Sequence, residues 1–193
     1  MMNNRTAIII DGAMFEMAKR RVMNHRPFDF NKLIQSLSGS DELVAAYYYN
    51  AHPTREWKAN PFFHCLSYVP HLELKMGRLV KQIVKGIEIP RQKRVDTMIS
   101  CDIALLACNK LVDSIHLFCG DDDFVPPVQL AVQEGVTIHL YYNPESFSEE
   151  LFNWASVQTS ISEEWITQFE LKGGIRAEKI IQEYGSIDGL LAS

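Results

Sequence analysis

The residues best suited to chemistry in this sequence are aspartates that follow apolar runs. The run 116–119 ends in a glycine and three consecutive acids: Asp121, Asp122 and Asp123. An earlier run of mostly β-branched residues, 6–10, ends in Asp11. Carboxylates crowded at a strand end repel one another, and a protein that keeps them usually neutralises them with a cation. These aspartates are therefore candidate ligands for a metal ion.

Two further aspartates lie in the segment 95–110, which is the clearest helix in the sequence because its apolar residues recur at helical spacing. Asp96 stands at its start, where an acid stabilises a helix as a cap or through the helix dipole, with no further role needed. Asp102 interrupts the apolar side of the helix. A buried carboxylate without a partner is costly, so we expect Asp102 to pair with a cation, cap backbone groups or bind a metal.

The three acids at 121–123 have two interpretations. Either Asp122 or Asp123 caps the helix that follows, or the cluster belongs to a metal site. In the second interpretation three or four aspartates hold one or two Mg²⁺ or Mn²⁺ ions, from the set Asp11, Asp96, Asp102, Asp121, Asp122 and Asp123. Capping alone leaves Asp11 and Asp102 unexplained, so we favour the metal. A metal held there would supply a hydroxide nucleophile and stabilise charge on a phosphate.

The segment 77–94 has the opposite charge. It contains six basic residues and one glutamate in a chain whose net charge is −5. Its glycines and proline predict a partly extended or mobile loop, and its charge offers a track for a polyanionic backbone. The candidate nucleic-acid contacts are Arg78, Lys81, Lys85, Arg91, Lys93 and Arg94.

Strand-like and helix-like segments alternate along the chain. The expected strands are 6–10, 43–49, 71–76, 114–119 and 136–142, and the expected helices are 14–23, 28–37, 57–69, 95–110, 124–134, 148–154 and 162–169. This alternation predicts a three-layer α/β domain with a mostly parallel central sheet. Ligands bind such sheets at the carboxyl ends of the strands. If the first and fourth strands are neighbours, Asp11 and Asp121 meet there.

Composition excludes several classes of protein. The chain has 193 residues, no apolar run near the roughly 20 residues that cross a bilayer, and no cleavable leader, so we expect a cytoplasmic protein with no membrane contact. Its four cysteines lack zinc-like spacing and are expected to be reduced and mostly buried. We expect its six scattered histidines to be structural. The domain boundaries we expect are 1–165 for the α/β domain and 166–193 for a helical tail.

The order of these motifs closely resembles that of the NYN domain, a branch of the PIN-like nucleases. The matching stretches are the strand that ends in Asp11-Gly12, the helix start Lys93-Arg94-Val95-Asp96 with Asp102 six positions on, and residues 119–124. The resemblance covers roughly residues 6–165 and implies a three-layer PIN-like domain with metal-dependent ribonuclease activity. It carries the catalytic role onto Asp11, Asp96, Asp102, Asp121 and Asp123, and the Mg²⁺ or Mn²⁺ ligands onto Asp11, Asp96, Asp121 and Asp123.

The chain departs from the family pattern at three positions. Met14 stands where the family has an asparagine, Arg94 where it has a glycine, and Asp122 where it often has a serine, so we treat Asp122 as a cap or an indirect support. The tail is similar in its second half to the helix-hairpin-helix segment of 5′ nucleases, but its hairpin glycines are compressed. A terminal amphipathic helix that packs on its own domain or on a partner is the alternative.

We therefore expect a metal-dependent ribonuclease that cuts RNA endonucleolytically in single-stranded or flexible regions. Two alternatives stay open. One is a non-catalytic module that binds nucleic acid or protein and retains the fold, which Met14 motivates. The other is a phosphatase for small phosphate esters, against which the long basic segment argues. The expected partner is RNA, with DNA cleavage and a homodimer left open.

Overall fold

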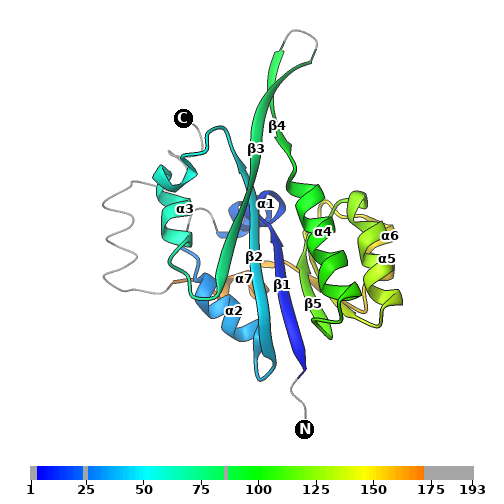
Figure 1. Cartoon of the computed structure of the whole chain (residues 1–193). Coiled ribbons are helices and arrows are strands. Elements are labelled where there is room, and N and C mark those ends of the chain that lie inside the picture. Colours follow the sequence, from blue (N-terminus) through cyan, green and yellow to red (C-terminus); the bar gives the residue numbers. More distant parts are fainter. Residues whose placement is uncertain (1–3, 24–25, 85–86, 172–193) are drawn as a thin grey trace.

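The computed structural model describes residues 4–23, 26–84 and 87–171. A seven-stranded sheet runs through the molecule in the order β4-β3-β2-β1-β5-β6-β7. The strands β1 to β5 are labelled in Figure 1. Its strands are β1 (Arg5–Asp11), β2 (Glu42–His52), β3 (Leu72–Val84), β4 (Ile87–Lys93), β5 (Ser114–Phe118), β6 (Thr137–Tyr142) and β7 (Val157–Ser160). All neighbouring pairs are parallel except β3 and β4. The mostly parallel sheet is as predicted.

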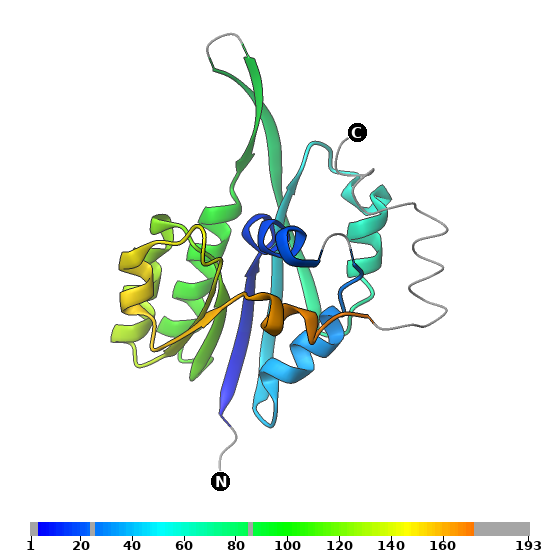
Figure 2. The same ribbon diagram turned by 180° about the vertical axis from the view of Figure 1, so that it is seen from behind.

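Helices cover both faces of this sheet, as the two opposite views show (Figures 1 and 2). One apolar cluster contains residues of α4, α5 and α6, and the other contains residues of α1, α2, α3 and α7. Strand β1 contributes side chains to both clusters, since Ile9 lies in the first and Ile8 and Ile10 lie in the second. The helices are α1 (Gly12–Met23), α2 (Phe30–Ser38), α3 (Pro61–Leu66), α4 (Val95–Cys108), α5 (Val125–Gln133), α6 (Glu149–Trp154) and α7 (Glu163–Thr167).

One predicted helix differs from the structure, and one strand of the structure was not predicted. The single helix expected over 57–69 is divided into a short 3₁₀ turn, η1 (Trp57–Ala59), and α3. The division falls at Asn60, whose side chain accepts a hydrogen bond from the Phe62 amide, with Pro61 in the first turn. An N-cap followed by proline begins a new helix. Strand β7 was not expected, because its four residues are mostly polar and partly exposed.

The largest difference concerns residues 77–94, where the prediction of a loop is wrong. Strand β3 continues to Val84 and turns back as β4, so the basic segment is an antiparallel hairpin. We call residues 78–84 and 87–93 the arm; it projects beyond the body of the molecule (Figure 1). Gly77 lies at its base, where a Cβ atom would stand 2.6 Å from the Lys93 carbonyl oxygen. This glycine therefore permits close strand packing and does not break the strand.

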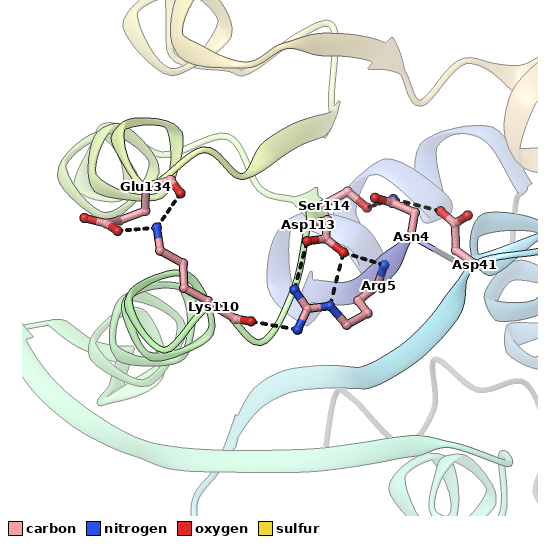
Figure 3. A network of polar contacts seen from close by, with 7 residues as sticks. All are labelled: Asn4, Arg5, Asp41, Lys110, Asp113, Ser114 and Glu134. Atoms are coloured by element: carbon pink, nitrogen blue, oxygen red, sulfur yellow. Dashed lines mark hydrogen bonds and ion pairs between the residues drawn. The ribbon is translucent and has the colours of Figure 1, made fainter. Parts of the chain in front are cut away.

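The amino ends of the strands are joined by a polar network (Figure 3). The guanidinium of Arg5 pairs with Asp113 at 2.9 Å and donates to the Lys110 carbonyl oxygen at 2.7 Å. The Lys110 ammonium in turn pairs with Glu134. These contacts tie β1 to the loops before β5 and after α5, at the end of the sheet opposite the carboxyl ends of the parallel strands.

The remaining expectations concern the thiols, the tail and the membrane. All four cysteines are free, as expected, but only Cys119 is buried, whereas Cys101 and Cys108 are exposed and Cys65 is intermediate. Packing continues past residue 165, because Ile166 and Phe169 are buried. The rest of the predicted tail, from residue 172, lies outside the described residues. Among the residues described, no helix has the length and apolar character that crossing a membrane requires.

Candidate functional site

Asp11 and Asp121 are brought to one edge of the sheet by the pairing of β1 with β5. These strands are parallel neighbours, with Ile10 opposite Phe118, so both chains leave the sheet at the same level. The Asp11 carboxylate accepts hydrogen bonds from the amides of Ala13 at 2.9 Å and Met14 at 3.4 Å, and thereby caps α1. The adjacency that the sequence left conditional is therefore present.

Gly12 allows this sharp turn from strand to helix. A Cβ atom at residue 12 would stand 2.5 Å from the Tyr49 carbonyl oxygen and 2.6 Å from the Tyr48 ring. Real Cβ atoms do not approach so closely. In the Asp-Gly pair, Asp11 thus places a carboxylate at the strand end, and Gly12 is required because no side chain fits directly after it.

Asp121 is the capping residue of the acidic cluster. It precedes the 3₁₀ turn η2 (Asp122–Phe124), and its carboxylate accepts a hydrogen bond from the Asp123 amide at 3.2 Å. The alternative interpretation, in which Asp122 or Asp123 caps the following helix, is therefore wrong, since the N-cap residue of α5 is Phe124 and makes no side-chain capping bond. All three acids are exposed, whereas Phe124 behind them is fully buried and anchors the turn.

Asp96 comes to the same edge from the base of the arm. It lies in the first turn of α4, one of the two positions expected for it. The N-cap position is held by Arg94, whose φ of 78° is in the left-handed region and whose side chain makes no capping hydrogen bond. An arginine in this conformation costs about 1 kcal/mol, which a glycine would avoid.

The four acids predicted to hold metal repel one another in the structure. The pKa of Asp11 is raised to about 6, first by burial and then by the charges of Asp96 and Asp121, against the two backbone hydrogen bonds that lower it. The pKa of Asp96 is also raised, first by burial and then by Asp121 and Asp123, while Arg91 opposes the shift. Asp11, Asp96, Asp121 and Asp123 therefore form one electrostatic group, which we call the acid group.

Asp102 has different neighbours. Its carboxylate accepts a hydrogen bond from the Tyr49 hydroxyl at 2.7 Å and pairs with the Lys75 ammonium at 2.7 Å. The bond to Asp102 also raises the pKa of Tyr49, after burial. Of the three roles expected for this acid, the structure shows the pair with a cation. The contacts therefore favour a structural role in holding α4 against β2 and β3.

Lys75 and Tyr49 were not among the residues singled out in the sequence. The Lys75 ammonium also lies 3.7 Å from the centre of the Tyr47 ring, so it is held between an acid and an aromatic face. A lysine within an alternating strand is the only local signal of this arrangement, because its partner Asp102 is 27 residues away.

The acid group suits a hard divalent cation in its chemistry. Its donors are carboxylate oxygens, which Mg²⁺ and Mn²⁺ prefer, and the recorded charges around it are mostly negative. Within the described residues, no three His, Cys, Asp or Glu side chains come together as a ready-made metal site. Mg²⁺ is commonly held by one or two carboxylates together with waters and substrate phosphate, so the residues present fit such a site.

The residues predicted to bind nucleic acid differ in the contacts that they make within the protein. Lys81 forms an ion pair with Glu88 at 2.7 Å. Arg91 donates to the Gln82 side chain at 3.1 Å and is close enough to Asp96 to affect its pKa. Arg78, Lys93 and Arg94 are exposed, and Lys85 lies outside the described residues.

Comparison with known proteins gives a family and a fold. The sequence model of the NYN domain matches residues 5–162. A crystal structure of a Vibrio parahaemolyticus protein of unknown function is similar, with a TM-score of 0.67 and 23% identity over 84% of this chain and 95% of that one. A putative UDP-N-acetylglucosamine 2-epimerase from Listeria monocytogenes has a TM-score of only 0.45 at 10% identity, over 96% of this chain and 43% of its own. No curated protein matches the sequence.

Proposed function

Because the chain belongs to the NYN domain family, we propose that it is a ribonuclease that hydrolyses RNA phosphodiester bonds with Mg²⁺ or Mn²⁺. The observation that carries the proposal is the meeting of Asp11 and Asp121 at the ends of adjacent strands. Asp96 is close enough to raise the pKa of Asp11, and Asp123 is close enough to raise that of Asp96. Such crowding costs stability, and a protein retains it where the charges are used.

In this proposal the acid group supplies the metal ligands. Asp11 and Asp121 would hold the cation directly, with Asp96 and Asp123 at its rim. The bound ion would lower the pKa of a water molecule and stabilise charge on the phosphate. The backbone amides of Ala13 and Met14 keep the Asp11 carboxylate oriented toward the strand ends. Asp102 acts as a positioning residue, because its contacts with Tyr49 and Lys75 fix the helix that carries Asp96.

The arm supplies the opposite charge beside the acids. It begins and ends at the edge of the sheet where the acid group lies, and Lys93 precedes Asp96 by only three residues. A polyanion bound along it would be led toward the acids. A small phosphate ester would have no use for such a surface, which favours RNA over the phosphatase alternative.

The test is incubation of the purified protein with labelled RNA and labelled DNA in Mg²⁺, Mn²⁺ or EDTA. We expect RNA to be cut internally with either metal and to stay intact in EDTA. The variant Asp11→Asn/Asp121→Asn should be inactive. Asp122→Asn is the matched control, since Asp122 lies in the same exposed turn but is not among the charges that raise the pKa of Asp11 or Asp96. Cleavage that persists in EDTA or in the double variant would refute the proposal.

A non-catalytic role remains the second candidate, and Met14 is the observation in its favour. Its side chain is buried, and its Cγ atom would lie 3.9 Å from a Cβ atom at Gly120, so an apolar group stands beside the residue that precedes Asp121. RNA binding that needs no metal, combined with no cleavage of any RNA supplied, would support this candidate over the nuclease.

A further inference from the structure

The two faces of the arm differ in charge. In the β3–β4 ladder Arg78 lies opposite Lys93, and Val80 lies opposite Arg91. Residues directly opposite each other in an antiparallel pair share a face, and alternate residues along a strand do too. Arg78, Arg91 and Lys93 therefore share one face, which we call the cationic face. Its other described members are uncharged: Val80, Gln82, Ile87 and Ile89.

The opposite face of the arm has no net charge. By the same register it carries Leu79, Lys81, Ile83, Glu88, Pro90 and Gln92. Its only charged residues, Lys81 and Glu88, pair with each other at 2.7 Å. A count of basic residues along the sequence thus overstates the positive charge of this face, because the charge of Lys81 is balanced by Glu88.

The charges of the cationic face lower the stability of the arm. Arg78 and Lys93 occupy directly opposite positions, where like charges destabilise a strand pair. Neither has an ion-pair partner among the residues that the structure describes, and both are exposed. Arg91 is exposed as well, and its recorded hydrogen bond is to the neutral Gln82. Exposed cations that form no ion pair within the described residues are suited to an anion from another molecule.

We propose that the cationic face binds the phosphates of a double-stranded RNA segment that flanks the cleavage site. This inference rests on the proposed nuclease function and names its substrate class as RNA with a stem next to an unpaired region. The contact is to the backbone and carries no base sequence preference. Arg78, Arg91 and Lys93 supply the phosphate contacts.

The composition of the arm favours a duplex over a single strand. Proteins that hold single strands combine cations with aromatic side chains on which bases stack. Residues 77–94 contain no Phe, Tyr, Trp or His. Double-stranded RNA is recognised by shape and by phosphate and sugar contacts, which need no aromatic residue. The three cations lie in the two register pairs Arg78–Lys93 and Val80–Arg91 at the foot of the arm, so the phosphate contacts are made there, at the end nearest the acid group.

The position of Arg91 links this face to the acids. The charge of Arg91 lowers the pKa of Asp96, which lies in the first turn of α4. Arg91 also shares its face of the arm with Lys93, at the foot of the arm. A stem on the cationic face would therefore end beside the acid group. The unpaired strand that leaves the stem would be the one presented for cleavage.

The test measures RNA binding in EDTA with Asp121→Asn protein, so that cleavage does not interfere. The probes are a duplex RNA with a single-stranded overhang and the overhang strand alone. The altered protein carries Arg78→Gln, Arg91→Gln and Lys93→Gln. The matched control carries Lys81→Gln and Glu88→Gln, which removes the charges of the opposite face without changing the net charge.

We expect the triple variant to bind the duplex at least about tenfold more weakly than the parent protein does. The slope of log K against log salt concentration should become shallower by about 2.7, or 0.9 for each of the three lost phosphate contacts. The control should bind as the parent protein does. Equal weakening by both variants, or binding of the overhang strand as tight as that of the duplex, would overturn the inference. So would unchanged RNA binding accompanied by a change in self-association, which would make the arm a protein interface.

Failure of the nuclease proposal is recognised separately. Wild-type protein is incubated with the same duplex in Mn²⁺. Binding through the cationic face without any cleavage would refute the nuclease and leave the duplex contact standing. Cleavage of the overhang strand alone at the same rate as the stem-linked overhang would refute the duplex contact and leave the nuclease standing.

Discussion

The ammonium group of Lys75 lies 2.7 Å from the carboxylate of Asp102 and joins the middle of α4 to β3. Both side chains are about one-fifth exposed, at 20% and 18%. The pair therefore lies in a setting where removing one partner leaves the other charge poorly solvated. Its position makes it a test of whether Asp102 acts through structure or through chemistry.

Replacing Lys75 by methionine should destabilise the protein by about 2 kcal/mol, because Asp102 then keeps its charge without a cation. The double variant Lys75→Met/Asp102→Asn should be more stable than Lys75→Met alone, since both charges are gone. Urea unfolding of the parent protein, Lys75→Met, Asp102→Asn and the double variant gives the interaction free energy between the two side chains. If Asp102 is a positioning residue, the double variant should retain more nuclease activity than Asp121→Asn. Equal loss of activity in both would make Asp102 part of the acid group.

Neutralising an acid at the strand ends should stabilise the metal-free protein. Asp11→Asn keeps an oxygen for the Ala13 amide but removes repulsion with Asp96 and Asp121, so we expect a gain of about 1 kcal/mol in EDTA. Added Mn²⁺ should raise the melting temperature of the wild type more than that of this variant. Thermal unfolding with and without Mn²⁺ measures both effects. A wild type that gains nothing from Mn²⁺ would argue against a metal at this site.

Arg94→Gly should stabilise the protein by up to about 1 kcal/mol, because the residue at this position has a φ of 78°. The matched control is Arg94→Gln, which removes the same charge and keeps the backbone strain of a non-glycine residue at this φ. Denaturant unfolding separates the two effects. If Arg94 contacts RNA, both variants should bind RNA more weakly, and only the glycine variant should be more stable. Equal stability of the two variants would show that the strain is relieved elsewhere.

A pH effect on stability is expected from His116. This side chain is buried, stacks on His139 with ring centroids 4.7 Å apart, and lies 3.0 Å from the Tyr141 hydroxyl. Burial and then His139 lower its pKa to about 4, against a weak opposing effect of Asp41. The unfolded chain therefore binds a proton that the folded chain does not, between about pH 6.5 and 4. Stability should fall as the pH decreases through this range.

The expected loss for His116 is about 2 kcal/mol between pH 7 and pH 4.5. Asp11 has the opposite sign, since its raised pKa favours the folded state as the pH falls below 6. The measurement is therefore made in Asp11→Asn protein with EDTA, by denaturant unfolding at several pH values. The same series in Asp11→Asn/His116→Leu should have a shallower slope. An unchanged slope would mean that His116 does not titrate differently on folding.

The sequence predicted the sheet edge better than it predicted the arm. Asp11 and Asp121 each follow a buried run, and the carboxyl ends of parallel strands share one edge, so their meeting was predictable once the strands were found. Gly77 and Pro90 misled the assignment of the arm. The first is required by a close backbone approach to Lys93, and the second lies on an edge strand, where a missing amide donor costs little.

The contacts of Asp102 were less predictable for another reason. The pattern of a helix shows that a carboxylate interrupts its apolar side, but which cation faces it depends on how the helix packs on a strand far away in the sequence. Lys75 is that cation because α4 follows the arm and returns over β3 and β2. Such a contact follows from tertiary packing and has no local signature.

The register of the arm also bears on how this fold can vary. Among the strands that the structure describes, β3 pairs beyond Arg78 with β4 alone, and β4 pairs with no strand other than β3. Residues can be inserted or removed in opposing pairs at the far end of this ladder without shifting the register of the sheet or the strand ends that carry the acids. The arm can thus act as a molecular ruler, whose length evolution or design can adjust independently of the acid group.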